Sequence, residues 1–320
     1  MNNPKWIAKL TATTPLRKAA TLALTNRFQT VLDYLPLAVE HPEEDIEHVH
    51  QLRVGTRRAE AAVNLFACCL ASKNRKTISR ELRRIRRTAG AARDWDVFLE
   101  QLKTPTEEAG ADMSGIDFLR GYAMSERLRA QARLVRSTPR PSDLHKSLEK
   151  TVSSVGNSKK KGTRLIDLAE PRLSQALDTL AKATTTDLAD DKNVHRVRLA
   201  GKRLRYAMDL FAHCFDAEFR EKHYAAVEEM QKLLGNANDS FNANEVLSSI
   251  QSQAPVFLGG LWSRYRATWE KLQQEHKQRW DEGRRQLQEW LVRWLQPSGE
   301  PALRRMLATV PKRGQLLILQ

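Results

Sequence analysis

The chain repeats a histidine-led basic segment, first at position 50 and again at position 195, an offset of 145 residues. The first copy reads His50-Gln-Leu-Arg53-Val-Gly-Thr-Arg57-Arg58, and the second reads His195-Arg-Val-Arg198-Leu-Ala-Gly-Lys202-Arg203. The same offset relates roughly residues 24–135 to residues 169–280. A repeat that holds its register over this length predicts a duplicated structural unit, so each copy has to build a related half of the fold.

Apolar side chains recur at helical spacing along almost the whole chain, and glycine is sparse, with 14 residues in 320. Alternation that would predict strands is nearly absent, so we expect an all-α protein. We expect helices near 15–38, 47–71, 75–91, 94–103 and 114–137 in the first half, and near 163–183, 192–216, 219–235, 239–252 and 257–295 in the second. This order predicts two antiparallel helical bundles related by an internal pseudo-twofold repeat.

The expected domain organisation has four segments. They are a first helical-bundle half over 1–140, a linker over 141–162, a second helical-bundle half over 163–296 and a C-terminal tail over 297–320. Serine, glycine and lysine dominate residues 153–162, which is typical of a flexible linker. The run Lys159-Lys160-Lys161 could bind an anion, but we interpret it as a solvated part of this linker.

The charge balance is strongly basic, with 53 Lys and Arg against 38 Asp and Glu and a formal net charge of +15. This balance predicts an acidic partner such as nucleic acid, an anionic membrane surface or a polyphosphate. We expect no membrane span, because the longest apolar runs fall far short of the roughly 20 residues that a bilayer requires. The three cysteines, without CxxC spacing or a predicted secretory signal, indicate reduced thiols in a cytoplasmic protein.

Helical phasing of the two repeated segments separates cations from apolar side chains. On the first helix the cation face carries His50, Arg53 and Arg57, and the opposite face carries Leu52, Ala59, Val63, Phe66 and Leu70. On the second helix the cation face carries His195, Arg198, Lys202 and Arg205, and the opposite face carries Val197, Leu204, Met208, Phe211 and Phe215. Each helix therefore buries one face and presents a row of cations on the other.

The helix after the first repeated segment adds further arginines, at positions 80, 83, 84, 86 and 87. Its counterpart keeps Lys232 and has Glu228 and Glu229 in place of two of them. Residues 50–97 contain 12 Lys and Arg against 4 Asp and Glu, whereas residues 195–242 contain 8 against 7. Since like charges this dense repel one another unless an anion bridges them, we expect an anion-binding surface. The first helical hairpin (residues 50–97) should contribute more to it than the second (residues 195–242).

Arginine outnumbers lysine on these faces, and its planar guanidinium makes bidentate contacts with phosphate oxygens. The two histidines either contact the same ligand or cap the starts of their helices, and their equivalent positions favour ligand contact. The candidate phosphate-binding residues are His50, Arg53, Arg57, Arg58, Arg80, Arg83, Arg84, Arg87, His195, Arg198, Lys202, Arg203, Arg205 and Lys232.

Two glycine–aspartate pairs lie at equivalent places, Gly90 with Asp94 and Gly235 with Asp239. Glycine is favoured where a helix ends, and aspartate is favoured as the N-cap of the next helix. We therefore expect a helix boundary inside each pair. Arg93 either adds to the anion surface or pairs with a neighbouring aspartate, and the sequence leaves both alternatives open.

No pattern for catalysis or for a cofactor is present: the chain has no Walker loop, HExxH or GxSxG motif. Two distant histidines are too few to predict a metal site. The tryptophans at 262, 269, 280, 290 and 294 have spacings that favour packing between helices over a stacking platform for bases. We expect a protein that is not an enzyme and that needs no cofactor or metal.

The chain resembles the CHAD family, the conserved histidine α-helical domain. The resemblance lies in the duplicated basic helix, His50-xx-Arg53-xxx-Arg57-Arg58 and His195-xx-Arg198-xxx-Lys202-Arg203, with Gly90-Ala-Ala-Arg93-Asp94 and Leu234-Gly235-Asn-Ala-Asn238-Asp239 after them. It covers nearly the whole chain up to about residue 296. The resemblance implies two helical bundles with basic helices along a central groove, binding of inorganic polyphosphate and, for some members, association with polyphosphate granules.

Two function classes other than polyphosphate binding stay open. The net charge also permits binding of an RNA or DNA phosphate backbone, although single-strand binders usually add stacking aromatic residues to their groove. A phosphatase or polyphosphate-processing enzyme is the third class, and phosphate release with added Mg²⁺ or Mn²⁺ would support it.

Overall fold

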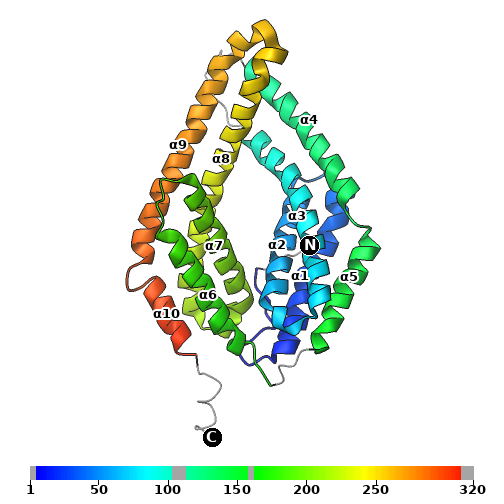
Figure 1. Ribbon diagram of the computed structural model, residues 1–320, viewed down its shortest axis with the longest axis vertical. Helices are drawn as coiled ribbons and strands as arrows, with labels where there is room; N and C mark the ends of the chain where they lie inside the picture. The colour runs from blue at the N-terminus through cyan, green and yellow to red at the C-terminus, as the bar shows by residue number, and fades with distance from the viewer. Residues whose placement is uncertain (1–4, 103–112, 158–161, 311–320) are drawn as a thin grey trace.

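The computed structural model describes residues 5–102, 113–157 and 162–310, and it is built from helices, as predicted. In Figure 1 the first five helices form one side of the molecule and the last five form the other. The first group is α1 (Leu16–Glu40), α2 (Glu47–Leu65), α3 (Ser72–Gln101), α4 (Ser114–Ser137) and α5 (Pro141–Ser153). The second group is α6 (Ile166–Thr184), α7 (Asp191–Phe211), α8 (Ala225–Leu258), α9 (Trp262–Trp294) and α10 (Glu300–Ala308).

The helices that carry the repeated segments have closely matching bounds. Shifted by 145 residues, α2 would run over 192–210, and α7 exceeds this range by one residue at each end. A π-helical turn, Phe219–Tyr224, precedes α8 in the second half, whereas α3 begins directly as an α-helix. The duplication of the whole unit stays a prediction from the sequence.

One apolar core extends through both halves. It contains the predicted stripes of the two repeated helices, among them Leu52, Val63, Val197 and Leu204, each fully buried. A second, smaller cluster lies where the long helices α3, α4, α8 and α9 meet, around Phe98, Leu119, Leu247 and Trp269. The apolar faces behind the cation rows are therefore the part of the helices that holds the fold together.

The predicted helix boundaries at the two glycine–aspartate pairs are wrong. Gly90 and Asp94 both lie inside α3, and Gly235 and Asp239 both lie inside α8. Among the described residues only Gly162 and Gly259 have positive φ. A glycine inside a helix costs only about 1 kcal/mol relative to alanine, and the packing of these long helices exceeds that cost.

The predicted linker and tail also contain packed helices. Residues 141–153 form α5, whose Leu144 and Leu148 belong to the core and which lies against α1 and α3. Residues 300–308 form α10, whose Leu303 and Leu307 are buried and which lies against α6. The run Lys159-Lys160-Lys161 and the last ten residues lie outside the described residues.

An N-terminal segment joins the two halves at the end opposite the α8–α9 tip. The Leu16 N–H donates to the Thr163 carbonyl and the Leu165 N–H donates to the Thr14 carbonyl, each at 2.8 Å. Nearer the N-terminus, the Lys5 ammonium pairs with Glu228 at 2.7 Å, and the Lys5 carbonyl accepts a hydrogen bond from the buried Arg27 guanidinium. These contacts hold α1 beside the start of α6 and α8.

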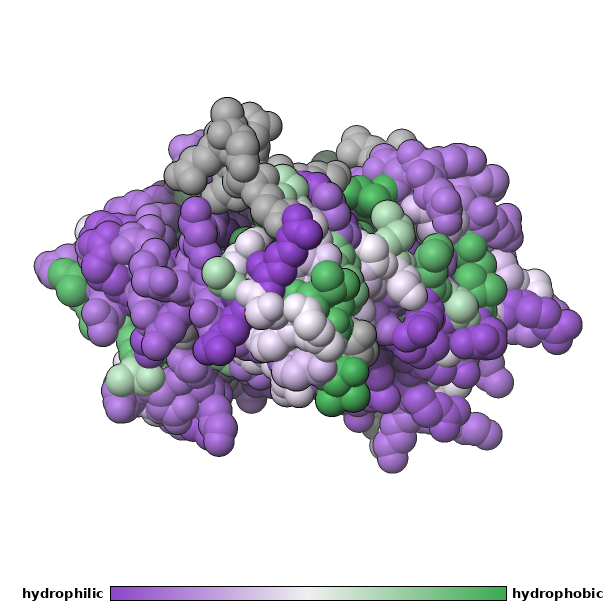
Figure 2. All heavy atoms as spheres, turned by 90° about the horizontal axis from the view of Figure 1, so that it is seen from above, coloured by the Kyte–Doolittle hydropathy of each residue, from purple (hydrophilic) through white to green (hydrophobic). Residues whose placement is uncertain are grey.

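The surface at the tip end is mostly hydrophilic, with some apolar groups near its middle (Figure 2). Val256, near the end of α8, and Leu261, in the short 3-10 turn that follows, are exposed. Within the described ranges we find no helix with an apolar stretch of the length that a bilayer requires.

The close approach of α8 and α9 supplies a stability test. A Cβ atom added at Gly283 would lie 2.3 Å from the Ala237 Cβ, an atom fixed to the backbone of α8. Gly283→Ala should therefore lower the free energy of unfolding by about 1–3 kcal/mol, measured by chemical denaturation. The matched change Gly121→Ala, where nothing lies within 4 Å of the added atom, should raise it by up to about 1 kcal/mol. Equal effects of the two changes would contradict the packing that we describe.

Candidate anion-binding site

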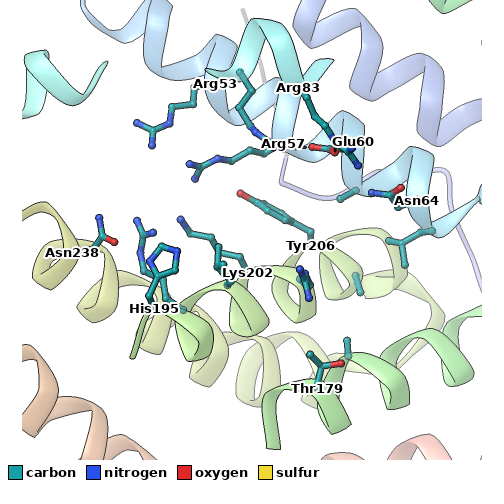
Figure 3. Close-up of a pocket in the computed structure, with 18 of the residues that line it drawn as sticks. Arg53, Arg57, Glu60, Asn64, Arg83, Thr179, His195, Lys202, Tyr206 and Asn238 are labelled. Atoms are coloured by element: carbon teal, nitrogen blue, oxygen red, sulfur yellow. Dashed lines mark hydrogen bonds and ion pairs between the residues drawn. The ribbon is translucent and has the colours of Figure 1, made fainter. Parts of the chain in front are cut away.

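The cation rows of α2 and α7 face each other across a space inside the molecule. Figure 3 shows Arg53 and Arg57 extending from α2 toward His195 and Lys202 on α7. Leu52 and Leu204 are buried on the opposite faces of their helices, so the apolar core fixes which way each cation row points. The amphipathic pattern of each repeated segment thus places its cations at one common site.

The space is a cavity of about 860 Å³ between α2, α3, α6, α7 and α8. Its polar lining comes from all five helices. The charged and polar residues that line it are Arg53, Arg57, Glu60, Asn64, Arg83, Arg86, Asp94, Arg172, Gln175, Thr179, His195, Arg198, Lys202, Arg203, Tyr206, Asn238 and Asn242.

Positive charge dominates this lining: eight side chains are Arg or Lys and two are carboxylates. Such a balance differs from an ordinary protein surface, where charges of both signs are interspersed. Cations held this close inside a cavity repel one another more strongly than they would in water. An anionic ligand would relieve the repulsion and contact several of the cations at once.

The pKa of Lys202 shows the effect of this repulsion most directly. Burial, followed by the charges of Arg57, Arg198 and Arg53, lowers the pKa of the Lys202 ammonium to about 6. Burial and the nearby Arg57 likewise lower the pKa of Arg198 to about 10. These shifts follow because both burial and neighbouring like charges disfavour the charged form of a cation.

The two carboxylates in the lining hold arginines in place. Glu60, which is nearly fully buried, pairs with Arg83 and Arg86 of the next helix. Asp94 accepts a hydrogen bond from the Arg53 guanidinium at 2.9 Å. Burial and the charge of Arg53 lower the pKa of Arg57, and a hydrogen bond with Tyr206 partly offsets them. These partners orient guanidinium groups toward the cavity without cancelling the excess of positive charge.

Half of the predicted phosphate-binding residues line this cavity. They are Arg53, Arg57, Arg83, His195, Arg198, Lys202 and Arg203. His50 lies beside the same cation row, where burial lowers its pKa and Arg93, Arg53 and Arg57 lower it further against the opposing effect of Glu47, but it does not line the cavity.

Arg58 and Arg205, also predicted to bind phosphate, do not line the cavity. The Arg58 Nε atom is 3.6 Å from a carboxylate oxygen of Asp209, which is buried inside α7. The charge of Arg205 also acts on this carboxylate, and its guanidinium lies 5.2 Å from the ring centre of Tyr206. Arg58 thus joins α2 to α7, because the single helical step from Arg57 turns its side chain by about 100° away from the cation face.

Arg80, Arg84, Arg87 and Lys232 are exposed and do not line the cavity. The predicted dominance of the first hairpin is wrong for the cavity itself, to which each half contributes four Arg or Lys side chains. The two glutamates of the second hairpin face other partners: Glu228 pairs with Lys5, and Glu229 pairs with Arg293 at 2.7 Å. The charge difference between the two hairpins therefore arises in part from residues that do not line the cavity.

Several lining residues were missed by reasoning from the sequence. Tyr206 lies one turn beyond Lys202 on α7, and Asn238 and Asn242 lie one turn apart on α8. Arg172 on α6 corresponds to Arg27 in the repeat, so the offset offered a signal, but Arg27 is buried and Arg172 reaches the cavity. Arg86 was counted in the basic run without being assigned to the site.

Within the described part of the chain, no group of three or more His, Cys, Asp or Glu side chains is placed to hold a metal ion. The three cysteines are present as thiols.

Comparison with known proteins adds a family and two solved structures. The family model for the CHAD domain matches residues 22–248. The crystal structure of the CHAD domain from the plant Ricinus communis has 21% sequence identity and a TM-score of 0.65, and the alignment covers 94% of each chain. PptA from Streptomyces chartreusis has 17% identity and a TM-score of 0.66, with 87% of this chain and 100% of that chain covered. No curated protein matches the chain.

The depressed pKa of Lys202 can be measured without any ligand. NMR of the lysine side chains, with Lys202→Met to identify the signal, should show Lys202 titrating near pH 6. Arg57→Gln should raise this pKa, because Arg57 is the neighbouring charge that lowers it most. Since the unfolded chain binds this proton more tightly, stability without ligand should rise with pH above about 6. Titration at the ordinary lysine value in both proteins would contradict the proximity of the two cation rows.

Proposed function

This chain belongs to the CHAD domain family, and from that premise we propose that it binds inorganic polyphosphate in the cavity between α2 and α7, without catalysing a reaction. The observation that carries the proposal is the lining, with eight Arg or Lys side chains against two carboxylates in about 860 Å³. Linear polyphosphate carries roughly one negative charge on each unit and no bases, so a binder needs several cations and no group that recognises bases.

Arginines on facing helices suit a chain of phosphates. Arg53 and Arg57 lie one turn apart on α2, and Arg198 and Lys202 lie one turn apart on α7. One turn of helix advances by about 5.4 Å, so each pair can contact successive groups of an extended anion. The planar guanidinium groups add bidentate hydrogen bonds to phosphate oxygens that lysine would not provide.

Binding of an anion would also restore the charge of Lys202. A phosphate beside the ammonium stabilises its protonated form and raises its pKa from the value of about 6 in the free protein. Binding is then coupled to proton uptake, and affinity should fall as the pH rises above about 6. The internal phosphates of the chain stay ionised in this range, so the pH dependence reports on the protein.

The cavity favours polyphosphate over a nucleic acid. Among the described residues that line it, Tyr206 is the only aromatic one, and single-strand binders usually stack bases on several such side chains. Phosphate contacts alone would still permit some RNA binding. We extend the proposal to location: a cytoplasmic protein that associates with polyphosphate granules, as the family resemblance implies for some members.

Replacing Arg53, Arg57 and Arg83 together by alanine should weaken polyphosphate binding and flatten its dependence on salt. Each lost phosphate contact removes about 0.7 from the slope of log affinity against log salt concentration, so the triple variant should lose about 2. The control replaces Lys146, Lys271 and Lys277 by alanine. These lysines are exposed and do not line the cavity, so the control should change the slope little. An equal loss in both variants would show that binding follows net charge and not this site.

Competition separates the candidate functions. With labelled polyphosphate bound at fixed salt, RNA that carries an equal number of phosphates should displace it poorly, because the cavity offers no stacking platform. Efficient displacement by RNA would favour a nucleic-acid backbone binder. Incubation with Mg²⁺ or Mn²⁺ should release no inorganic phosphate, and release that is lost in the triple variant would favour an enzyme.

A further inference from the structure

A second, smaller cavity of about 200 Å³ adjoins the first one. Asp94 and Asn242 line both cavities, so the two spaces meet at these side chains. The smaller cavity lies toward the end of the molecule where α3, α4, α8 and α9 form the second apolar cluster. Its lining is Ala91, Asp94, Trp95, Val97, Phe98, Gln101, Asp239, Asn242, Ala243 and Val246.

The charge of the lining reverses where the cavities meet. Among the residues that the structure describes, eight Arg or Lys side chains line the larger cavity, whereas the smaller one is lined by no cation and by two carboxylates, Asp94 and Asp239. Along α3, Asp94 lies 11 residues beyond Arg83, which corresponds to about 16 Å of helix. An anion that extends from the cations toward the apolar end would therefore meet two negative charges and then an apolar wall.

The two aspartates act on each other as well as on the cations. Burial raises the pKa of Asp239 and Asp94 raises it further, against the effects of Arg198, Arg53 and Lys202. Asp94 is more exposed and is held by Arg53 at 2.9 Å. The pair thus lies directly behind Arg53 and Arg198, one aspartate from α3 and one from α8, at positions related by the 145-residue offset.

We propose that Asp94 and Asp239 form an acidic boundary that ends the polyphosphate site and limits how many phosphates the protein engages. This inference rests on the proposed function and deepens it. The two carboxylates repel phosphates beyond Arg53 and Arg198, and no cation among the described residues lines the smaller cavity to attract them.

A simpler role for Asp94 would be to position Arg53. The two roles differ in how affinity depends on chain length. Loss of a positioning contact changes affinity for chains of every length that reach Arg53. Loss of a boundary changes affinity only for chains long enough to pass it.

The experiment compares the wild-type protein with Asp94→Asn/Asp239→Asn, using polyphosphates of defined length at 0.15 M salt, where the Debye length is about 8 Å. For wild type, affinity should rise with chain length and then level off once the larger cavity is filled. For the double variant, affinity should level off only at longer chains. Its affinity for long chains should rise roughly tenfold, and the slope of log affinity against log salt concentration should steepen by about 1.

Glu100 and Glu245 provide the matched control. They lie six residues farther along α3 and α8, are also related by the 145-residue offset, are exposed and line neither cavity. Glu100→Gln/Glu245→Gln makes the same change of charge and should leave the length at which affinity levels off unchanged. A shift as large as that of the aspartate variant would mean that net charge alone sets the length, which would overturn the proposal.

A change in the opposite direction completes the test. Asn242→Asp adds a third carboxylate where the cavities meet and should move the levelling to shorter chains. If wild type binds polyphosphate but neither variant moves the levelling length, the acidic boundary is wrong while the proposed function stands. If wild type shows no saturable binding of polyphosphate at all, the proposed function itself fails.

Discussion

The repulsion between the cation rows of α2 and α7 is the constraint on which the rest of the structure depends. Burial and the surrounding charges lower the pKa values of Lys202 and Arg198, so the free protein holds these side chains at a cost in stability. The apolar stripes behind them, with Leu52 and Leu204 fully buried, offset that cost. The fold thus uses its core to hold like charges together where a ligand can neutralise them.

Contacts away from the cavity keep the two halves at a fixed separation. The N-terminal segment is bonded to the start of α6, Lys5 pairs with Glu228, and Arg58 lies beside the buried Asp209. The apolar core is continuous across these contacts. Because the cations are in place before any anion arrives, binding requires little ordering of side chains, and a preorganised site loses less entropy when it binds.

Periodicity in the sequence was sufficient to predict the helical class, the buried stripes and seven of the residues that line the cavity. It was not sufficient to tell which arginines reach the cavity, because an arginine can occupy any helix position that does not face the apolar core. Arg58 turns toward Asp209, and Glu228 turns toward Lys5, through contacts between residues far apart in the chain. Gly90 and Gly235 were misread for a related reason, since packing decides whether a glycine ends a helix. Asp94, assigned to a cap, lies instead at the junction of the two cavities.

The most direct test is a crystal structure of the protein with a short polyphosphate. We expect phosphates between α2 and α7, within hydrogen-bond distance of Arg53, Arg57, Arg198 and Lys202, and none beyond Asp94 and Asp239. Phosphates along the exposed arginines of α3, at Arg80, Arg84 and Arg87, with none between the two repeated helices, would contradict it.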